Sequence, residues 1–160
     1  EQPFFITKST GKKIELVHQP YENYGIVRSF TLVDGMKGNT SKFGRDWLGF
    51  WGKDMNATID LGKTETISKI SINTLSSEGS WIYYPKSIEI LVSKEGKNYI
   101  PITIVTSKEI YENKGRIVVE FDKQNVQFIK VIAENNGIIA DGKPGAGSNS
   151  WLFVDEISAE

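Results

Sequence analysis

Apolar and polar residues alternate along most of this chain, in short runs separated by glycine, proline, asparagine and aspartate. A period of two places successive side chains on opposite faces of an extended backbone, so these runs predict half-buried β-strands. The runs are rich in isoleucine and valine, which pleated surfaces favour. We therefore predict an all-β protein with about eight strands, enough for a sandwich or a barrel: Lys13–His18, Ala57–Leu61, Ile67–Asn73, Ser87–Ser93, Ile100–Val105, Arg116–Phe121, Phe128–Glu134 and Trp151–Ser158.

The connecting segments contain turn signals and several long loops. Glu95-Gly96 predicts a hairpin, because glycine readily adopts the positive φ of tight turns. Asp34-Gly35 and Asp141-Gly142 are similar signals within longer loops. No segment has the spacing of a long amphipathic helix, and residues 31–37 are expected to form at most one helical turn. Long loops in a compact domain commonly carry function, and those expected here are Gln19–Phe30, Met36–Asn56, Leu75–Pro85 and Asn135–Ser150.

Composition narrows the possible partners. The chain has 160 residues, which suits a single domain with its own core. It contains no cysteine, which excludes disulfides, thiolate zinc sites and cysteine nucleophiles. The formal net charge is −1, without a basic stripe, so neither nucleic acid nor a polybasic lipid anchor is predicted. Short strands and scattered charges favour a monomer.

The sequence shows no catalytic constellation. The single histidine, His18, has no nucleophile motif to pair with and is interpreted as structural. Asp155-Glu156 suggests the carboxyl pair of a sugar hydrolase, but neighbouring residues of a regular strand face opposite sides, so we expect them not to share a site. The motifs of serine hydrolases, zinc proteases and phosphate loops are absent. This chain is therefore predicted not to be an enzyme.

All four tryptophans, Trp47, Trp51, Trp81 and Trp151, lie in or beside glycine-rich and polar segments rather than in the alternating runs. An aromatic ring in a loop either caps the end of the core or offers its face to a ligand. Several such rings together favour a binding surface. Trp151 and Phe50 are interpreted as caps of the core.

Four stretches in a fixed order identify a family: TLVDGMKGNT, DWLGFWGKDMNATIDLG, SWIYYPKSIEILVSKEGKNY and PGAGSNSWLFVDEI. The chain resembles a discoidin-type domain, also called the coagulation-factor type C domain, in the form of a family 32 carbohydrate-binding module. Within that group it is most similar to the C-terminal accessory domain of bacterial β-N-acetylhexosaminidases of glycoside hydrolase family 20, the chitobiases. The resemblance implies a jelly-roll β-sandwich of antiparallel strands with its ends close together.

The resemblance also implies a context for the domain. Residues 1–160 would form a single domain excised from the C-terminus of a larger enzyme. That enzyme would be periplasmic, exposed on the bacterial cell surface or secreted.

The same resemblance implies a structural Ca²⁺ ion. Its ligands would be Asp34 in the Asp-Gly turn, Asn39 or Thr40 shortly after it, and Glu156 in the last strand, together with backbone carbonyl groups. This set agrees with the preference of Ca²⁺ for six to eight hard oxygen ligands. The alternatives are a plain turn at Asp34 and a solvated strand end at Glu156.

The function implied is non-catalytic carbohydrate binding that keeps a hexosaminidase near glycans with N-acetylhexosamine- or galactose-type sugars. Aromatic rings would stack on the sugar, and polar side chains would bind its hydroxyl groups. The candidates are Trp81 and Tyr84, then Trp47 and Trp51, for the rings, and Asp46, Asn136 and Asp141 for the hydroxyl groups.

Two alternatives remain. In the first, the domain packs against the catalytic domain of its parent chain without affinity for sugar, because interface cores are also rich in aromatic residues. In the second, loop residues bind a membrane surface or a protein. Trp47-Leu48, Phe50-Trp51 and Trp81–Tyr84 would insert, and Lys42, Arg45 and Lys53 would attract anionic lipid against the opposing charges of Asp46 and Asp54. This second alternative is the weaker one.

Overall fold

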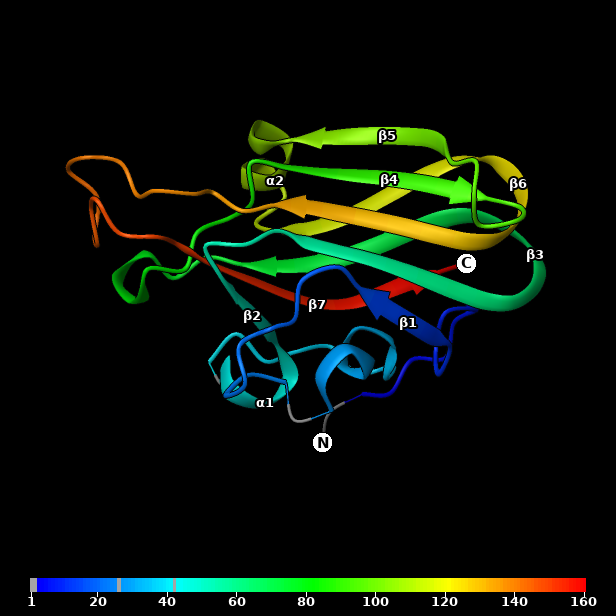
Figure 1. Cartoon of the computed structure of the whole chain (residues 1–160), viewed down its shortest axis with the longest axis horizontal. Helices are drawn as coiled ribbons and strands as arrows, with labels where there is room; N and C mark the ends of the chain where they lie inside the picture. Colours follow the sequence, from blue (N-terminus) through cyan, green and yellow to red (C-terminus); the bar gives the residue numbers. More distant parts are fainter. Residues whose placement is uncertain (1–2, 26, 42) are drawn as a thin grey trace.

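The computed structural model describes residues 3–25, 27–41 and 43–160, and β-strands dominate it (Figure 1). The strands are β1 (Lys13–Leu16), β2 (Leu48–Trp51), β3 (Met55–Leu75), β4 (Ser87–Ser93), β5 (Ile100–Thr106), β6 (Arg116–Glu134) and β7 (Trp151–Ala159). The helices are short: α1 (Phe43–Asp46), α2 (Ser107–Glu112) and 3₁₀ turns at Arg28–Val33 and Glu78–Ser80.

The two longest strands, β3 and β6, each run the length of the molecule, bend, and return, as Figure 1 shows. The N-terminal and C-terminal halves of each strand therefore belong to different layers. In one layer β3 residues 55–60 pair with β1 and with β6 residues 128–133, and β4 and β5 follow. In the other, β3 residues 69–73 pair with β6 residues 116–120, and β7 and β2 follow. All these pairings are antiparallel, and the result is a β-sandwich whose layers are joined through the bends.

The bend in β3 follows from its sequence. Gly62 has a φ of 83°, a conformation that glycine adopts without steric cost. Its N–H donates to Oδ1 of Asp60 over 2.8 Å, and the register of β3 against β6 shifts between Asp60 and Glu65. Pairing with β6 continues on both sides of this turn, with a second register shift between Ile67 and Lys69, so one hydrogen-bonded strand contains both predicted segments.

The predicted strands are confirmed, with two differences in how they are divided. The segments predicted at 57–61 and 67–73 are the two halves of β3, and those at 116–121 and 128–134 are the two halves of β6. β2 was not predicted, because its sequence LGFW is almost entirely buried and shows no alternation. The hairpin at Gly96 and the turns at Gly35 and Gly142 are also confirmed, since all three glycines have positive φ.

The core lies between the two layers and is apolar. Ile59, Ile90 and Ile129 from one layer and Ile70 and Ile72 from the other are completely buried and belong to one cluster. A smaller aromatic cluster, with Trp47 and Phe153 at its centre, covers the end of the sandwich nearest to β2.

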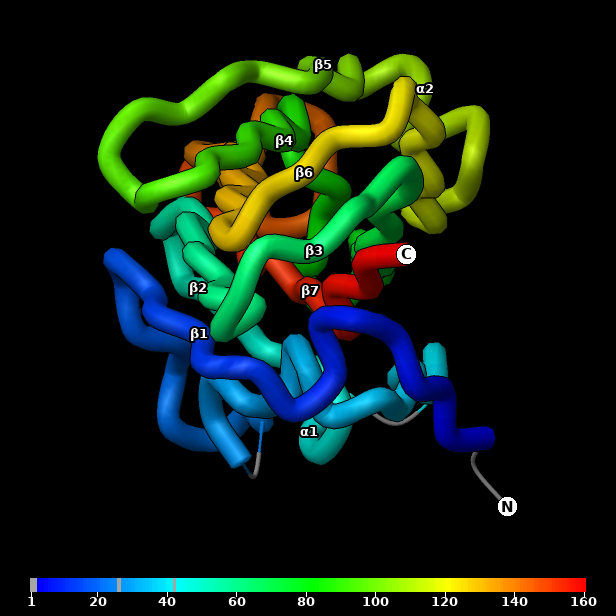
Figure 2. The backbone as a smooth tube through the Cα atoms, turned by 90° about the vertical axis from the view of Figure 1, so that its right-hand side faces the viewer, coloured from blue at the N-terminus to red at the C-terminus, as the bar shows by residue number. Residues whose placement is uncertain are grey.

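The two ends of the described chain lie close together, as the family resemblance implies. The N–H of Lys8 donates to the carbonyl of Ala159 over 2.9 Å, and the hydroxyl of Ser9 donates to the carbonyl of Ile157. In Figure 2 the N-terminal segment and the end of β7 lie on the same side of the molecule. Among the described residues, none of the helices is long and apolar enough to cross a membrane.

Candidate functional site

Four aromatic rings, two from loops and two from strand ends, meet at one end of the sandwich. We call Tyr21, Trp51, Trp81 and Trp151 the loop-end cluster. Trp51 and Trp81 are nearly parallel, with an interplanar angle of 24° and ring centroids 6.3 Å apart. Trp151 lies 4.9 Å from Trp51 and meets Tyr21 edge-on at 5.3 Å. Tyr21 is 50% exposed and Trp81 is 39% exposed, so the cluster reaches solvent.

Backbone contacts fix the orientation of Trp81. Its φ of 63° lies in the left-handed region, directly after the 3₁₀ turn at Glu78–Ser80. The N–H of Trp151 donates to the Trp81 carbonyl over 2.8 Å. A Cβ at Gly145 would lie 2.8 Å from three atoms of the indole ring, so the Gly145 backbone packs directly on one face of Trp81. Only the remaining part of the ring is open to a ligand.

A buried side chain that the sequence analysis did not single out joins these loops. Asn135 is 5% exposed, and its Nδ2 donates to the carbonyl oxygens of Phe50, Lys53 and Ser150. Its Oδ1 accepts hydrogen bonds from the N–H of Gly137 and the hydroxyl of Ser150. Asn135 therefore ties the segment after β2 to the loop between β6 and β7, and it positions Trp51 and Trp151.

A cavity of about 410 Å³ opens beside Tyr21 and Trp51. Its remaining lining comes from Gln19, Pro20, Glu22, Asn23 and Lys53. It therefore combines ring surfaces with hydrogen-bonding side chains of both charges. Tyr21 was missed in the sequence analysis because a single tyrosine in a long loop carries no pattern.

The other predicted sugar-binding residues are scattered. Tyr84 packs against the main core and meets Tyr111 edge-on at 5.3 Å, and Asn136 lines a separate cavity with both tyrosines. Asp141 is exposed in the turn before Gly142. Neither Tyr84, Asn136 nor Asp141 lines the cavity beside Tyr21 and Trp51.

Trp47 is buried, and this corrects its assignment to an exposed platform. The residue is 2% exposed, and its Nε1 donates to the carbonyl of Asn39 over 3.1 Å. A Cβ at Gly38 would lie 2.4 Å from the Trp47 ring, so the loop backbone covers it closely. Trp47 therefore caps the core and is not an exposed platform.

Burial also argues against the membrane alternative, because most of the side chains proposed to insert into a membrane are in the core. Trp47, Leu48 and Phe50 are each at most 2% exposed. Lys42, one of its three basic residues, lies outside the described residues. Membrane insertion through these residues would require the end of the core to open.

The second notable site contains the consecutive residues Asp155 and Glu156 of β7. Asp155 Oδ2 accepts the N–H of Gly38, and Glu156 Oε2 accepts the N–H of Gly35 over 3.1 Å. Glu156 has a φ of 33°, and the register between β3 and β7 shifts next to it, which marks a bulge. The bulge turns both carboxyl groups toward the loop 34–38. The expectation that they face opposite sides of a regular strand is therefore wrong.

Both carboxyl groups are almost completely buried, Asp155 being 0% and Glu156 1% exposed. Burial raises the pKa of Asp155 to about 8. Burial also raises the pKa of Glu156 to about 9, and the nearby charge of Asp155 adds to that shift. The pKa of Asp34 is raised as well, mainly by burial, although the N–H of Met36 donates to its Oδ1 and opposes the change.

One oxygen of each buried carboxyl group, Oδ1 of Asp155 and Oε1 of Glu156, has no hydrogen-bond partner. A buried, unpartnered oxygen is energetically costly, and a cation would compensate for it. In the described part of the chain, no three acidic, histidine or cysteine side chains converge to hold a metal by themselves. Backbone carbonyl groups would have to supply the other ligands, as Ca²⁺ sites commonly allow. The carboxyl pair therefore fits a hard cation that prefers oxygen ligands.

The remaining predicted metal ligands are placed differently. The side chains of Asn39 and Thr40 are exposed, and Oδ1 of Asn39 accepts hydrogen bonds from the N–H and the hydroxyl of Ser41. Asp46, predicted to contact a sugar, lies near the buried carboxyl groups. Its charge helps to raise the pKa of both Asp34 and Asp155. Asp155 was not predicted as a metal ligand, because only the bulge places its carboxyl group on the same side as that of Glu156.

Comparison with protein-family models gives one match, to the F5/8 type C domain, over residues 17–154. No curated protein sequence matches the chain significantly.

Solved structures resemble the whole chain at low sequence identity. Chitosan-binding module 1 of a chitosanase/glucanase from Paenibacillus sp. IK-5 is 13% identical, with a TM-score of 0.63, covering 97% of this chain and 98% of the module. The lectin domain of lectinolysin, solved with Lewis B antigen, is 17% identical, with a TM-score of 0.65 and coverage of 99% and 98%. The module CpGH89CBM32-5 from Clostridium perfringens, in complex with GalNAc-β-1,3-galactose, is 14% identical, with a TM-score of 0.63 and coverage of 96% and 99%. At these identities the likeness establishes the fold.

Proposed function

Because the chain belongs to the F5/8 type C domain family, we propose that it is a non-catalytic carbohydrate-binding module whose ligand binds at the loop-end cluster. The observation that carries this proposal is the cavity beside Tyr21 and Trp51, where aromatic and polar side chains from separate loops converge. Sugars present C–H groups on one face and hydroxyl groups at their edges. A site with rings on one side and hydrogen-bonding groups around them matches both features.

The affinity expected of such a site is modest. Tyr21 and Trp51 offer ring surface, and Glu22 and Asn23 offer acceptors and donors at the edge of the cavity. Each hydrogen bond contributes about 1 kcal/mol net, because it replaces one made to water. A single sugar unit should therefore bind with a dissociation constant on the order of micromolar to millimolar.

The ligand class that we propose is an N-acetylhexosamine- or galactose-type sugar. Structural neighbours of this fold have been solved with Lewis B antigen and with GalNAc-β-1,3-galactose. The motif order of the sequence supports a parent enzyme of the β-N-acetylhexosaminidase type, acting in the periplasm, at the bacterial surface or after secretion. A monomeric module of this kind would raise the local concentration of substrate for the parent catalytic domain.

We also propose a structural Ca²⁺ ion between the loop 34–38 and the last strand. Glu156 and Asp155 would hold it through their unpartnered oxygens, with Asp34 beside them. The ion would neutralise carboxyl groups whose ionisation is otherwise opposed by burial. Its role would be to fix the loop 34–38 on β7.

The proposed sugar site is tested by substituting two tyrosines that are similarly exposed but lie in different parts of the structure. Tyr21 is 50% exposed in the loop-end cluster, and Tyr111 is 59% exposed on α2. A glycan array identifies the best ligand, and calorimetric titration in calcium-containing buffer measures its affinity. Tyr21→Ala should weaken binding about tenfold or more, while Tyr111→Ala should leave it unchanged.

Trp81→Ala gives a second measurement in the same assay, since it removes the ring that packs on Trp51. An equal loss of sugar affinity in Tyr21→Ala and Tyr111→Ala would contradict the placement of the sugar site at the loop-end cluster. Absence of binding to every glycan would favour the alternative in which the domain packs against its parent catalytic domain.

A further inference from the structure

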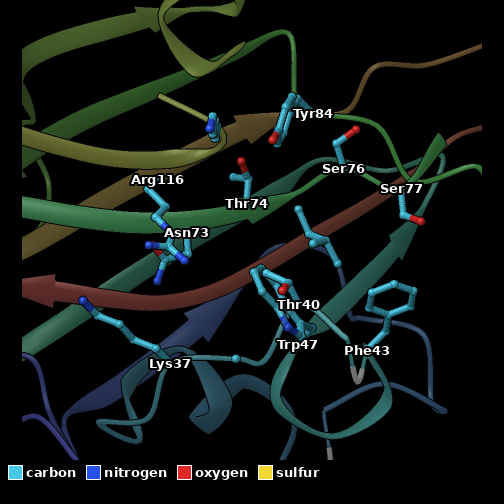
Figure 3. A pocket seen from close by; sticks show the side chains of 13 residues that line it. Lys37, Thr40, Phe43, Trp47, Asn73, Thr74, Ser76, Ser77, Tyr84 and Arg116 are labelled. Carbon is cyan, nitrogen blue, oxygen red and sulfur yellow. The ribbon is translucent and has the colours of Figure 1, made fainter. Parts of the chain in front are cut away.

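We propose that a second cavity, here called the lateral pocket, binds an acidic sugar residue. The cavity has a volume of about 360 Å³ and lies between the loop before α1, the end of β3 and the start of β6 (Figure 3). It shares no lining residue with the cavity beside Tyr21 and Trp51. The inference therefore goes beyond the loop-end site and does not depend on it.

Three cationic side chains line the lateral pocket. Lys37 comes from the loop before α1, Lys114 from the connection between α2 and β6, and Arg116 is the first residue of β6. Arg116 lies beside Asn73, and Lys37 lies on the same side of the cavity (Figure 3). The described residues that line the cavity include no aspartate or glutamate. Positive charge collected around a concave surface attracts an anion.

One carboxyl group, that of Asp155, is hydrogen-bonded to the backbone of this lining but does not face the cavity. Asp155 accepts a hydrogen bond from the N–H of Gly38, which lines the cavity. The Asp155 side chain itself is completely buried behind the loop and is not part of the lining. An anion in the cavity would thus meet Lys114 and Arg116, whereas the Nζ of Lys37 also lies over the Phe5 ring, 4.8 Å from its centroid.

The backbone holds Lys114 and Arg116 in place through an unusual conformation. Lys114 and Gly115 both have left-handed φ values, 53° and 76°. The Gly115 carbonyl accepts the N–H of Thr74 over 2.7 Å and the Thr74 hydroxyl over 3.1 Å. A Cβ at Gly115 would lie 2.5 Å from both the Thr74 carbonyl and the Tyr84 ring. A lysine in a left-handed conformation is disfavoured, and such residues are often found at functional sites.

The rest of the lining fits a sugar ring better than a bare ion. Thr40, Ser76 and Ser77 present hydroxyl groups, and Asn73 presents an amide. Phe43 and Tyr84 add ring surface on the other side, as Figure 3 shows. The volume is at the lower end of the range for ligand pockets, which suits a single ring. An arginine beside such a ring pairs well with a carboxylate or a sulfate ester.

The experiment compares three sugars that differ only at carbon 6: galactose, galacturonic acid and galactose 6-sulfate. Each is titrated into the ¹⁵N-labelled protein in calcium-containing buffer, and amide shifts are followed by NMR. We expect both acidic sugars to shift the amides of Gly38, Thr74 and Gly115, with an affinity that falls as salt is added. Galactose should leave these three amides unchanged.

Variants locate the charge that is recognised. Arg116→Gln and Lys114→Gly should each weaken binding of the acidic sugars about tenfold or more, since a charge-assisted hydrogen bond is lost. Lys114→Gly relieves the left-handed conformation, so its effect on binding does not come from unfolding. Lys97→Gln removes the same charge from the exposed β4–β5 hairpin, and it should have no effect. Tyr21→Ala should likewise leave acidic-sugar binding unchanged.

The outcomes separate this proposal from the loop-end site. Binding of only one acidic sugar would support the pocket and identify its anionic group. Inorganic sulfate that binds as tightly as galactose 6-sulfate would overturn recognition of a sugar. Absence of shifts with both acidic sugars, or equal losses in Arg116→Gln and Lys97→Gln, would overturn the pocket itself. If Tyr21→Ala loses binding of neutral sugars but still binds acidic sugars, the result would support two separate sites.

Discussion

The main core and the carboxyl pair of β7 are equally buried, but the core consists of apolar side chains and the pair of ionisable ones. Ile59, Ile129 and their neighbours form a continuous apolar interior in which each side chain gains from leaving water. Asp155 and Glu156 also lie at 0% and 1% exposure, yet each retains an unpartnered oxygen and a raised pKa. The first region contributes stability under all conditions, whereas the contribution of the second depends on pH and on bound ions.

The largest expected effect tests the apolar side of this comparison. Ile129→Ala should lower the free energy of unfolding by about 2–5 kcal/mol, because it leaves a cavity in the centre of the core. Ile104 on β5 is 59% exposed, and Ile104→Ala should cost less than about 1 kcal/mol. Urea denaturation in EDTA measures both. Similar losses in the two variants would contradict a stability concentrated between the layers.

The next prediction concerns the proposed ion. Calcium at about one hundred times its dissociation constant should raise the free energy of unfolding by about 2.7 kcal/mol. Glu156→Gln should abolish this response, because it removes the charge of the ligand in the last strand. Glu120→Gln, at an exposed position of β6, should retain it. Thermal unfolding with and without calcium measures the shift, and a full response in Glu156→Gln would rule out this residue as a ligand.

The last prediction concerns the pH dependence of the metal-free protein. The pKa values of about 8 for Asp155 and about 9 for Glu156 exceed those of carboxyl groups in an unfolded chain, which are about 4. The folded state therefore binds more protons than the unfolded state between these limits. The stabilisation is complete below about pH 4 and is lost as the pH rises through 8 and 9.

In EDTA, the free energy of unfolding should fall progressively as the pH rises from about 5 to about 9, because unfolding releases the protons that both buried carboxyl groups hold. Saturating calcium should flatten this profile, because the ion favours the ionised carboxyl groups. Urea midpoints across the pH range provide the measurement. A metal-free profile that is level, or one that rises with pH, would show that the two carboxyl groups are better solvated than the structure indicates.

The alternating runs were sufficient to predict the strands. Residues 57–61 and 70–73 show period two on either side of a turn, and that pattern depends only on which face of each segment is buried. The short strand β2 escaped prediction because both its faces are covered, by the core and by the loop around Tyr24. The glycine turns at Gly35, Gly96 and Gly142 were predictable since they depend on local φ alone.

The candidate sites were less predictable, because they depend on contacts between distant segments. Trp47 and Trp51 have similar sequence surroundings, yet the Gly38 loop covers Trp47 while Trp51 lines a cavity beside Tyr21. Asn135 has no motif, and its role follows from two segments distant in the sequence that meet around its side chain.

The sequence by itself determined the class of fold, the segments that become strands, and the absence of cysteine chemistry, because alternation, turn residues and composition are local properties. The tertiary structure alone decided which aromatic rings remain open and where the acidic side chains meet. A single bulge at Glu156 reverses the face of one carboxyl group, and no local pattern encodes that reversal. Likewise, Lys37 and Arg116 are far apart in the sequence and line one cavity only in the folded chain.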